Sequence, residues 1–464
     1  MKNNLKILYN NTSWTLSDEI KSVTVIKEID ITKMSAPTTA VDITLKCTLD
    51  TDLDFALDCP CDVYDNDTPI FKLYVSDSAR NSDYEWKLSL YGALGRMASK
   101  KYYGGVYGDP ADYTSLDFYK EGVYYIPTIS DIAGIIDDIS SVSGANITYD
   151  SSVFPLVNET LHRVGMPIGS SRDGLLNAAF VLGAQMRDEY GSVILFKPNE
   201  TVKQISDERI LNDAKIQKVD LVNIKLYTYE YNMRKAGAIF YITNYYYDSN
   251  NVLQRQGQAV YNCNIIPRDT PTSDGRVNEI SSGYDENIGT KTADENRIIE
   301  YKNPISTYNM QLLEWGSQNG KAPMHPNYAD IDEKIQYPDA VKYDIEENVI
   351  DLVINSDSEN DPSEIKVRLV SPEIAELISE RVKNDFSYNR IATVNIVEGY
   401  DKNLYGEHKF GECKFGYNEQ EAIDIGDKVK FNIRSKSVEG YITRVKYNLN
   451  GTIIIKNCEV TYKE

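Results

Sequence analysis

Residues 166–198 read MPIGSSRDGLLNAAFVLGAQMRDEYGSVILFKP and carry the clearest local structural signals in the chain. Ser170 followed by Asp173 is a capping-box pattern, in which side chains satisfy free backbone amides at a helix start. Apolar residues then recur at spacings of three and four, the period of a helix with one buried face. They are Leu175, Ala179, Leu182 and Met186. We expect this helix to end at Gly191 and a strand to follow over residues 192–197, so the stretch predicts a packed helix–strand unit that carries no obvious chemistry.

A second unit of the same kind precedes the first. Thr128 and Asp131 form another capping-box pattern, and isoleucines follow at helical spacing. Gly144 is expected to end that helix, and residues 146–149 read as a strand. The two units together predict one α+β domain over residues 108–200.

The N-terminal part of the chain is predicted to be β. Residues 41–47 alternate between apolar and polar side chains, and residues 85–90 do the same, which is typical of strands with one buried face. The run Asp65-Asn66-Asp67 indicates a hairpin turn before a further strand at residues 70–76. Several short strands separated by turns predict a sandwich or barrel over residues 1–107.

The middle of the chain contains long strands and then a weakly patterned region. Residues 219–266 carry apolar or tyrosine side chains at successive positions, which predicts strands that are buried on both faces. Residues 268–345 are rich in Asp, Asn, Gly and Pro, and a connection of this length is usually functional or orders on a partner. Its acid-rich end, residues 329–348, could bind calcium but lacks the ligand spacing of a calcium-binding loop.

The last part of the chain predicts a helix followed by a small antiparallel β domain, over residues 371–464. Ser371-Pro372 is an N-cap followed by a proline at the first helical position. The apolar stripe expected to be buried consists of Ile374, Leu377, Ile378 and Val382. Asn450-Gly451 separates two β-type runs and is the strongest short-range hairpin signal in the chain.

Composition excludes several classes of protein. The chain has 464 residues, 41% of them hydrophobic, and no apolar run approaches the ~18 residues of a membrane span. The N-terminus lacks the pattern of a signal peptide, so we expect synthesis and assembly in a cytoplasm. A net charge of −21, from 70 acidic and 49 basic residues, opposes nucleic-acid binding by counterion release. It suits a soluble acidic surface, or a passage through which a polyanion slides without sticking.

Tyrosine is the most over-used aromatic residue, with 35 copies against 11 phenylalanines and 3 tryptophans. Tyrosine suits half-exposed strands and subunit interfaces, because the ring can be buried while the hydroxyl stays hydrated. The composition therefore favours a protein with extensive β-sheet interfaces.

Motifs of catalysis and metal binding are not found in the sequence. The three histidines lie far apart, at His162, His325 and His408. Cys59-Pro60-Cys61 does not have a zinc spacing, and no HExxH, GxSxG or phosphate-binding glycine loop occurs. A dyad of Cys413 with His408 and a glycosidase pair of carboxylates are the enzymatic alternatives that spacing alone leaves open. We predict no catalytic, cofactor-binding or metal-binding residues, no cofactor, and a protein that is not an enzyme.

Three landmarks give the chain a resemblance to a known family. Residues 91–109 read YGALGRMASKKYYGGVYGD, and residues 170–198 form the capped helix–strand unit. The tail reads IDIGDKVKFNIRS over residues 423–435 and VEGYITRVKYNLNGTIIIKNCEV over residues 438–460. In order and spacing these resemble the hub family of bacteriophage tail baseplates. That family also occurs in phage-tail-like bacteriocins and is related to the spike proteins of type VI secretion.

The resemblance covers about residues 1–200 and 371–464, whereas residues 268–345 have no place in it. It implies an α+β, mostly β fold with tail-tube-like β-barrel domains, an intervening α+β domain and a C-terminal helix plus antiparallel β domain. The domains implied are a first barrel at 1–107, the α+β domain at 108–200, a β-rich second barrel region with a long insertion at 201–370, and the C-terminal part at 371–464.

The resemblance further implies a homotrimer in which each subunit carries two tube-like barrels. Three subunits would form a pseudo-sixfold ring that joins the hexameric tail tube, or a tube-initiator protein, to the central spike. Tape-measure and other baseplate proteins would be further partners of this virion component. DNA could pass through the lumen without specific nucleic-acid binding. The location implied is the tail baseplate of a virion or tailocin particle, a contractile injection system in some members, assembled in the bacterial host cytoplasm.

A second hypothesis comes from a different class. The chain could be a host-surface tail protein, carbohydrate-binding or cell-wall-degrading, with residues 268–345 as its recognition segment. Hubs of this family sometimes carry an appended lytic domain, and we expect none here, because no stretch remains after the last hairpin. The adaptor hypothesis is therefore preferred.

Overall fold

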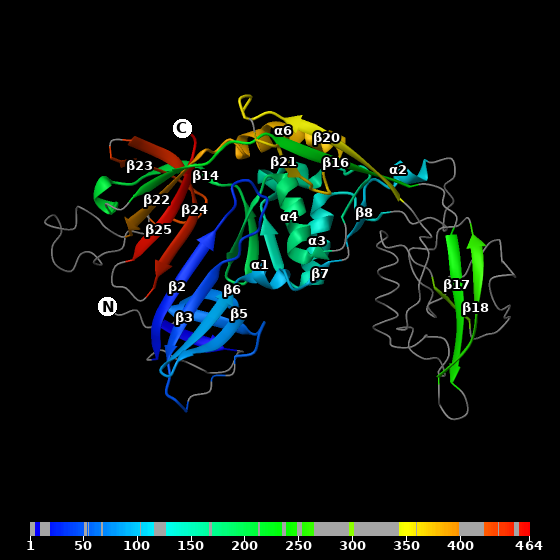
Figure 1. Ribbon diagram of the computed structural model, residues 1–464, viewed down its shortest axis with the longest axis horizontal. Coiled ribbons are helices and arrows are strands. Elements are labelled where there is room, and N and C mark those ends of the chain that lie inside the picture. Colours follow the sequence, from blue (N-terminus) through cyan, green and yellow to red (C-terminus); the bar gives the residue numbers. More distant parts are fainter. Residues whose placement is uncertain are drawn as a thin grey trace.

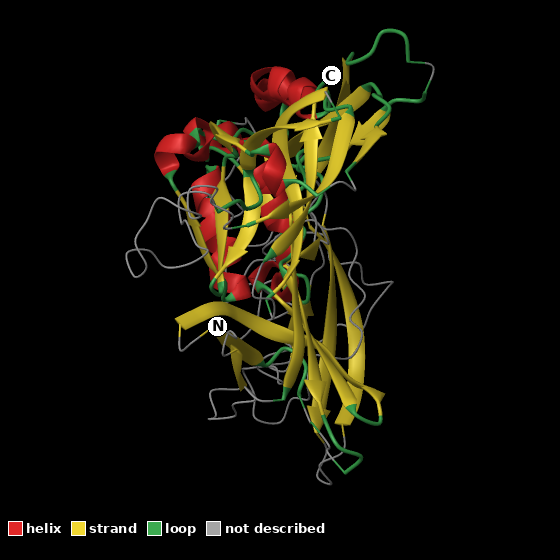
Figure 2. Ribbon diagram, turned by 90° about the vertical axis from the view of Figure 1, so that its left-hand side faces the viewer, coloured by secondary structure: helices red, strands yellow, loops and turns green. Residues whose placement is uncertain are grey.

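The computed structural model describes most of the chain. The described residues are 5–9, 19–115, 127–233, 238–263, 297–300, 343–398 and 422–464, apart from short gaps at 10–18, 51–52, 54, 66–67, 103, 167–168, 212–213, 248–252, 359, 435 and 450–453. Strands dominate, and the helices lie together in one part of the body (Figures 1 and 2). The predicted class, α+β with mostly β structure, is confirmed.

The N-terminal β-domain is a six-stranded antiparallel sheet in the order β1-β4-β5-β6-β3-β2. Its strands are β1 (Leu5–Tyr9), β2 (Ile20–Glu28), β3 (Ala40–Lys46), β4 (Pro60–Asp65), β5 (Thr68–Ser82) and β6 (Glu85–Tyr91). The alternation predicted in residues 41–47 is confirmed, since Val41, Ile43 and Leu45 are fully buried. The hairpin predicted at residues 65–67 is confirmed by the pairing of Asp65 with Thr68.

The C-terminal β-domain is a second six-stranded sheet, in the order β14-β23-β24-β25-β22-β15. Its strands are β14 (Asn199–Gln204), β15 (Lys215–Lys218), β22 (Arg390–Val397), β23 (Asp427–Ile433), β24 (Lys436–Asn448) and β25 (Ile455–Tyr462). The domain has its own apolar core, separate from that of the N-terminal domain. The predicted hairpin of β24 and β25 is confirmed by their antiparallel ladder, while the Asn450-Gly451 turn lies outside the described residues.

Beside the two β-domains lies an α/β unit, which has the largest apolar core among the described residues (Figure 1). Its helices are α1 (Ala93–Met97), α2 (Ala111–Thr114), α3 (Ile132–Ser143), α4 (Ser171–Leu182) and α6 (Pro372–Asp385). Its short strands are β7 (Lys101–Tyr102), β8 (Gly105–Tyr107), β9 (Asn146–Tyr149), β10 (Val164–Met166), β11 (Gly169–Ser170), β12 (Gln185–Glu189), β13 (Ser192–Phe196) and β21 (Ser363–Ile365).

The stretch at residues 166–198 folds differently from its prediction at one end. The capping box of Ser170 and Asp173 is present, but α4 ends at Leu182 and not near Gly191. Gly183 adopts a left-handed conformation with φ +70°, and a Cβ there would lie 2.7 Å from Arg381 Cδ, so glycine is needed where the helix stops. β12 and β13 then form a hairpin. Met186 is therefore a buried strand residue, not part of the helical stripe.

Two other helix predictions need smaller corrections. α3 is capped by the Asp131 side chain, which accepts the Gly134 amide, so the helix starts after Asp131 and the Thr128 capping box does not form. Ser371 caps α6 as predicted. Leu377, however, is 66% exposed, and Ala375 is fully buried in the apolar stripe instead. The predicted and the observed buried faces of α6 both fit the helical period, so spacing alone does not distinguish them.

A long insertion begins and ends at one hairpin. β16 (Ile224–Met233) pairs antiparallel with β20 (Tyr343–Leu352), and Met233 faces Tyr343 directly. Residues 234–342 are thus inserted between two neighbouring positions of one ladder. They include a separate sheet of β17 (Ala238–Tyr247), β18 (Leu253–Cys263) and β19 (Arg297–Glu300), which stands apart from the body in Figure 1. The predicted strands within residues 219–266 are confirmed, while most of residues 268–345 lies outside the described residues.

Replacing residues 234–342 by the dipeptide Asn-Gly is expected to leave the body folded and at least as stable as in the full chain, because a two-residue Asn-Gly hairpin suits the directly facing Met233 and Tyr343 and a shorter loop costs less entropy to close. Thermal unfolding of the shortened chain measures this. The matched control removes residues 224–352, and with them the buried Ile224, Leu226 and Leu352 of the central core. The control is expected not to fold; a shortened chain that also fails to fold would contradict the prediction.

Candidate functional site

One segment of the chain contacts three other parts of the molecule. Residues 27–39, here called the junction segment, run from the end of β2 to the start of β3. Along it, Lys27, Lys33 and the Thr38–Thr39 pair each meet a carboxylate from a distant region. The carboxylates belong to Asp424, Asp385 and Asp188. These contacts determine how the β-domains and the α/β unit are held together.

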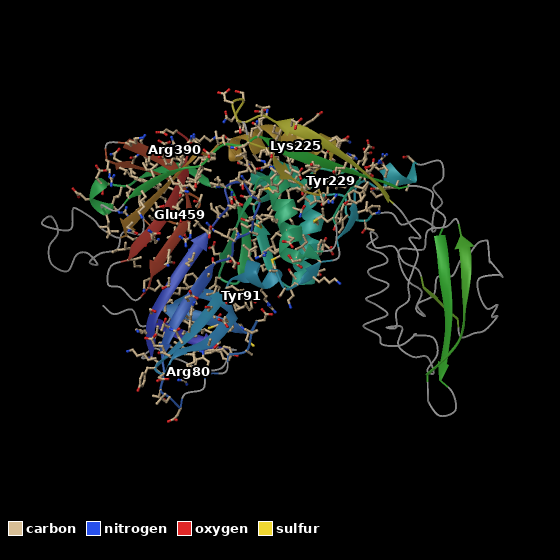
Figure 3. The ribbon with its side chains drawn as sticks, viewed as in Figure 1. Arg80, Tyr91, Lys225, Tyr229, Arg390 and Glu459 are labelled. Carbon is tan, nitrogen blue, oxygen red and sulfur yellow. The ribbon has the colours of Figure 1, made fainter. Side chains whose placement is uncertain are left out.

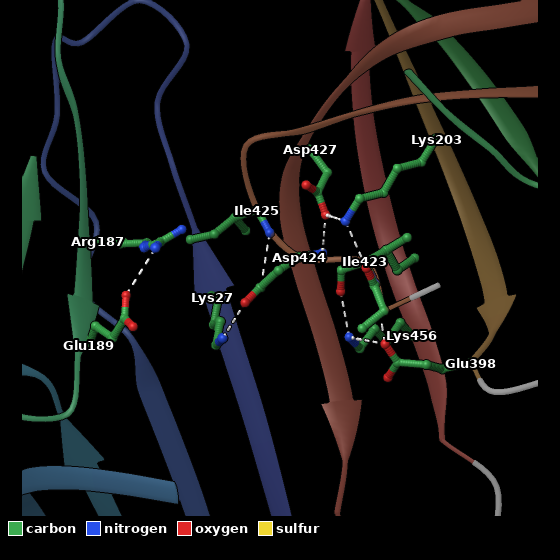
Figure 4. A network of polar contacts seen from close by, with 11 residues as sticks. Lys27, Arg187, Glu189, Lys203, Glu398, Ile423, Asp424, Ile425, Asp427 and Lys456 are labelled. Atoms are coloured by element: carbon green, nitrogen blue, oxygen red, sulfur yellow. Dashed lines mark hydrogen bonds and ion pairs between the residues drawn. The ribbon is translucent and has the colours of Figure 1, made fainter. Parts of the chain in front are cut away.

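The first contact joins the two β-domains. Lys27 Nζ lies 2.5 Å from Asp424 Oδ2 (Figure 4). Burial alone would raise the pKa of Asp424, but the Lys27 ammonium and a hydrogen bond from the Ile425 amide hold it below its usual range. The backbones join as well, since residues 24–28 of β2 pair with residues 444–448 of β24. The two sheets are therefore continuous through the β2–β24 seam.

The loop that carries Asp424 is organised by the IDIGD sequence quoted above. Asp427 Oδ2 accepts hydrogen bonds from the Asp424 amide at 2.8 Å and from Lys203 Nζ at 2.7 Å. Gly426 has φ +84°, and a Cβ there would lie 2.6 Å from Phe196 Cε2. Glycine is thus required by both conformation and packing. The motif builds a tight turn that leads into β23.

A buried ion pair lies behind this turn. Lys456 Nζ is 2.6 Å from Glu398 Oε1, and the two side chains are only 10% and 8% exposed (Figure 4). The same ammonium also donates to the carbonyl of Ile423, and Glu398 accepts the Ile423 amide. A buried pair needs such additional hydrogen bonds to offset its desolvation. Together they attach the turn to β22 and β25.

The second contact joins the junction segment to the α/β unit. Lys33 Nζ lies 2.7 Å from Asp385 Oδ2, with side-chain exposures of 5% and 10%. Arg381 donates to the same oxygen at 3.1 Å and also to the Phe180 carbonyl at the end of α4. Burial lowers the pKa of Lys33, and Asp385 opposes that shift. One carboxylate thus serves two cations that come from the junction segment and from α6.

The third contact is made by Asp188 of β12. Its carboxylate accepts hydrogen bonds from Thr38 Oγ1 at 2.8 Å, from the Thr39 amide at 2.7 Å and from the Leu94 amide at 2.8 Å. It packs so closely against Gly92 that a Cβ at that position would lie 2.1 Å from the Asp188 Cγ. Burial raises the pKa of Asp188, although these hydrogen bonds oppose the rise. The residue acts as a cap for α1 and a clamp on the junction segment.

Of the residues that the sequence suggests for chemistry, Cys59, Cys61 and His162 lie within the described part of the chain. Within the described part of the chain, no group of three or more His, Cys, Asp and Glu side chains could hold a metal ion. Burial raises the pKa of Cys61 to about 12 and that of Cys458 to about 12, so both thiols stay protonated at neutral pH. His162 pairs with Asp112 at the surface. The alternative dyad, Cys413 with His408, lies outside the described residues, as does His325.

Most of the junction residues gave no sequence signal. Asp188 stands between Arg187 and Glu189, and such a charged run reads as a solvated turn. Lys33 and Asp385 belong to no motif. Only the turn at residues 423–427 carries a recognisable sequence pattern, through its Asp and Gly residues. The pairs are contacts across more than a hundred residues of sequence, so spacing could not reveal them.

None of the helices in the described residues has the length and apolar character needed to cross a membrane.

Comparison with known proteins gives structural similarities alone. No family model and no curated protein matches the sequence. The chain is similar to the 43 kDa tail protein of prophage MuSo2 from Shewanella oneidensis, at 9% identity, 99% and 98% coverage of the two chains and a TM-score of 0.47. It is similar to the tail protein from Neisseria meningitidis MC58, at 7% identity, 99% and 97% coverage and a TM-score of 0.47.

A third similarity is to a chain in the structure of the phage P2 baseplate in its activated conformation with Ca, at 9% identity, 99% coverage of both chains and a TM-score of 0.28. The three similar structures are thus a prophage tail protein, a tail protein and a phage baseplate.

Proposed function

We propose that this chain is the structural hub of a phage tail baseplate or of a phage-tail-like bacteriocin. In this proposal it is a non-enzymatic homotrimer that joins the hexameric tail tube to the central spike. The observation that carries the proposal is a repeat: the two β-domains share one strand order. Numbered along the chain within each domain, both sheets run first, fourth, fifth, sixth, third, second.

Two local details support the repeat. The fifth strands, β5 and β24, each carry a bulge against the sixth strand, between Val75 and Asp77 and between Ile442 and Arg444. Before each fourth strand, a residue with positive φ donates its amide to the residue just ahead of that bulge. Asp58, with φ +60°, donates to Val75, and Gly426, with φ +84°, donates to Ile442. One strand differs, because β14 runs parallel to β23 whereas β1 is antiparallel to β4.

A repeated β-domain suits a protein that joins a sixfold-symmetric tube to a threefold-symmetric spike. Three chains with two similar β-domains each would present six similar units to a sixfold tube, while the ring as a whole keeps threefold symmetry for a spike. The two β-domains are our proposed tube-like barrels. The first is the N-terminal domain within residues 1–107. The second, predicted from the sequence within residues 201–370, is proposed here to draw on residues 199–218 and 390–462, because β16, β20 and β21 form a separate sheet. The α+β domain proposed at 108–200 lies beside them.

The junction contacts and the charge fit this role. The β2–β24 seam and the three carboxylate contacts fix one β-domain against the other, as a ring of defined geometry requires. The net charge of −21 per chain suits a lumen through which an acidic polymer passes without binding. We place the protein in the tail baseplate of a particle assembled in a bacterial cytoplasm, in contact with tube, tape-measure and spike proteins.

Light scattering of the purified full-length chain tests the proposal and is expected to give the mass of a trimer. Co-purification with the spike and tube proteins of the same particle is the second measurement. A chain that stays monomeric at high concentration and binds neither protein would overturn the adaptor role.

The host-surface hypothesis keeps one supporting observation. The sheet of β17, β18 and β19 projects from the tip of the β16–β20 hairpin and stands apart from the body (Figure 1). A recognition module would have this placement. Glycan binding or peptidoglycan cleavage by the full chain, lost when residues 234–342 are removed, would favour that hypothesis.

A further inference from the structure

The β2–β24 seam uses one edge from each β-domain. β2 is the second strand of the N-terminal domain, and β24 is the fifth strand of the C-terminal domain. They pair antiparallel from Thr24 opposite Asn448 to Glu28 opposite Arg444. The Leu449 amide donates to the Val23 carbonyl and the Ile29 amide to the Thr443 carbonyl, which extends the contact at both ends. The seam therefore joins a second strand to a fifth strand.

The same two edges remain open on the opposite domains. β15, the second strand of the C-terminal domain, pairs with β22 alone among the described residues, and all of Lys215–Lys218 is exposed. β5, the fifth strand of the N-terminal domain, pairs with β4 only as far as Tyr74. Beyond that point, residues 77–82 of β5 pair with β6 on one side, and no described strand covers the other side.

We propose that β15 of one copy pairs antiparallel with residues 77–81 of β5 in the next copy and thereby repeats the β2–β24 seam between chains. The inference rests on the proposed homotrimer and specifies its subunit interface. Every β-domain in the ring would then use its second strand and its fifth strand in the same way. The partner is a second copy of this chain, because only a copy supplies the same repeat.

The repeat also fixes the register of the new seam. Because the bulge is shared, Asp77 in the N-terminal domain is equivalent to Arg444 in the C-terminal domain. The next residues, Ser78 and Val445, are then equivalent as well. In each domain the pairings can be traced from this bulge through the sixth and third strands to the second strand. This makes Lys218 in the C-terminal domain equivalent to Lys27 in the N-terminal domain. Since Lys27 faces Val445 within the chain, Lys218 is expected to face Ser78 of the neighbour.

Both edges are exposed, and their positions in the molecule indicate the direction of assembly. Lys215 and Lys218 line the exposed β15 edge, and Asp77 lies on the exposed part of β5. Lysines on an exposed edge strand discourage pairing with arbitrary strands, so an edge of this kind suits a specific partner. Arg80 of β5 and Arg390, which pairs with Lys218, lie at opposite ends of the two β-domains (Figure 3). The edges are thus placed for a head-to-tail contact between chains.

The test is a cysteine pair at the predicted register. Lys218→Cys combined with Ser78→Cys places the two thiols directly opposite across the seam, within the Cα separation of about 4.4–6.8 Å that a disulfide spans. The matched control combines Lys218→Cys with Ser82→Cys, about 13 Å further along the strand and out of reach. The natural cysteines stay in place in both variants. After mild oxidation, a non-reducing gel is expected to show covalent trimers for the in-register pair only, and at most dimers for each single variant.

Each outcome decides between the seam and the hub. Covalent trimers from the in-register pair support the seam. A chain that is trimeric by light scattering but is not linked by this pair, or is linked equally well by the control pair, overturns the seam and leaves the hub standing. A chain that is monomeric by light scattering and forms no covalent oligomer overturns both.

Discussion

Replacing Asp385 by alanine is expected to destabilise the protein by about 3–5 kcal/mol, because it leaves the buried Lys33 and the half-buried Arg381 without their carboxylate. Lys33 and Arg381 both donate to Asp385 Oδ2, and the Lys33 side chain is only 5% exposed. Urea unfolding of the full chain, followed by tryptophan fluorescence, measures the loss. Lys33→Met is expected to cost less, since Arg381 and Asp385 remain paired.

The matched control for Asp385 is on the same helix. Glu380→Ala removes a carboxylate that is 85% exposed and pairs with Lys383 at the surface. Exposed pairs contribute between zero and about 1 kcal/mol, so this variant is expected to unfold close to the wild type. Equal unfolding midpoints for the two variants would show that Asp385 does not hold the junction segment to α6.

Replacing Asp188 by alanine is expected to cost about 3 kcal/mol. Three donors lose their acceptor at once: the Thr38 hydroxyl and the amides of Thr39 and Leu94. A buried donor without a partner costs about 1–3 kcal/mol, and solvent entering the space is expected to offset part of the sum. Thermal unfolding compared with wild type measures the loss.

The neighbouring residue supplies the control for Asp188. Among the described residues Glu189 forms its ion pair with Arg187, and its side chain is 54% exposed, so Glu189→Ala is expected to change stability by less than about 0.5 kcal/mol. An Asp188→Ala variant as stable as Glu189→Ala would contradict the clamp. Hydrogen exchange gives an independent readout, because the amides of Thr39 and Leu94 should exchange faster only in the Asp188 variant.

The Asp385 and Asp188 variants also bear on the proposed function, because both residues fix the position of the junction segment. Asp385 and Asp188 hold the junction segment against the α/β unit, while Lys27 and the β2–β24 ladder hold it against the C-terminal β-domain. A ring closes only when the angle between its units is fixed. Loss of either carboxylate is therefore expected to weaken assembly of the proposed trimer as well as the stability of the chain.

Local sequence signals predicted the elements well where they act on neighbouring residues. The capping box at Ser170, the cap at Ser371 and the alternation in residues 41–47 are all confirmed, because each depends on contacts within a few residues. The end of α4 was wrong for a related reason. Spacings of three and four continue through Met186, and nothing local reveals that Gly183 is held left-handed against Arg381 of a distant helix.

The sequence by itself determined the class of the protein: mostly β, acidic, and without a catalytic motif. Composition and short-range periodicity do not depend on contacts between distant residues, so they can be read directly from the sequence. Only the tertiary structure showed that β2 and β24 form one seam, that β14 and β15 join a domain built largely after residue 390, and that Asp188 is a clamp. Strand order and buried ion pairs depend on contacts between residues far apart in sequence. Many pairings of similar strands satisfy the same local pattern, and packing of the whole chain selects one of them.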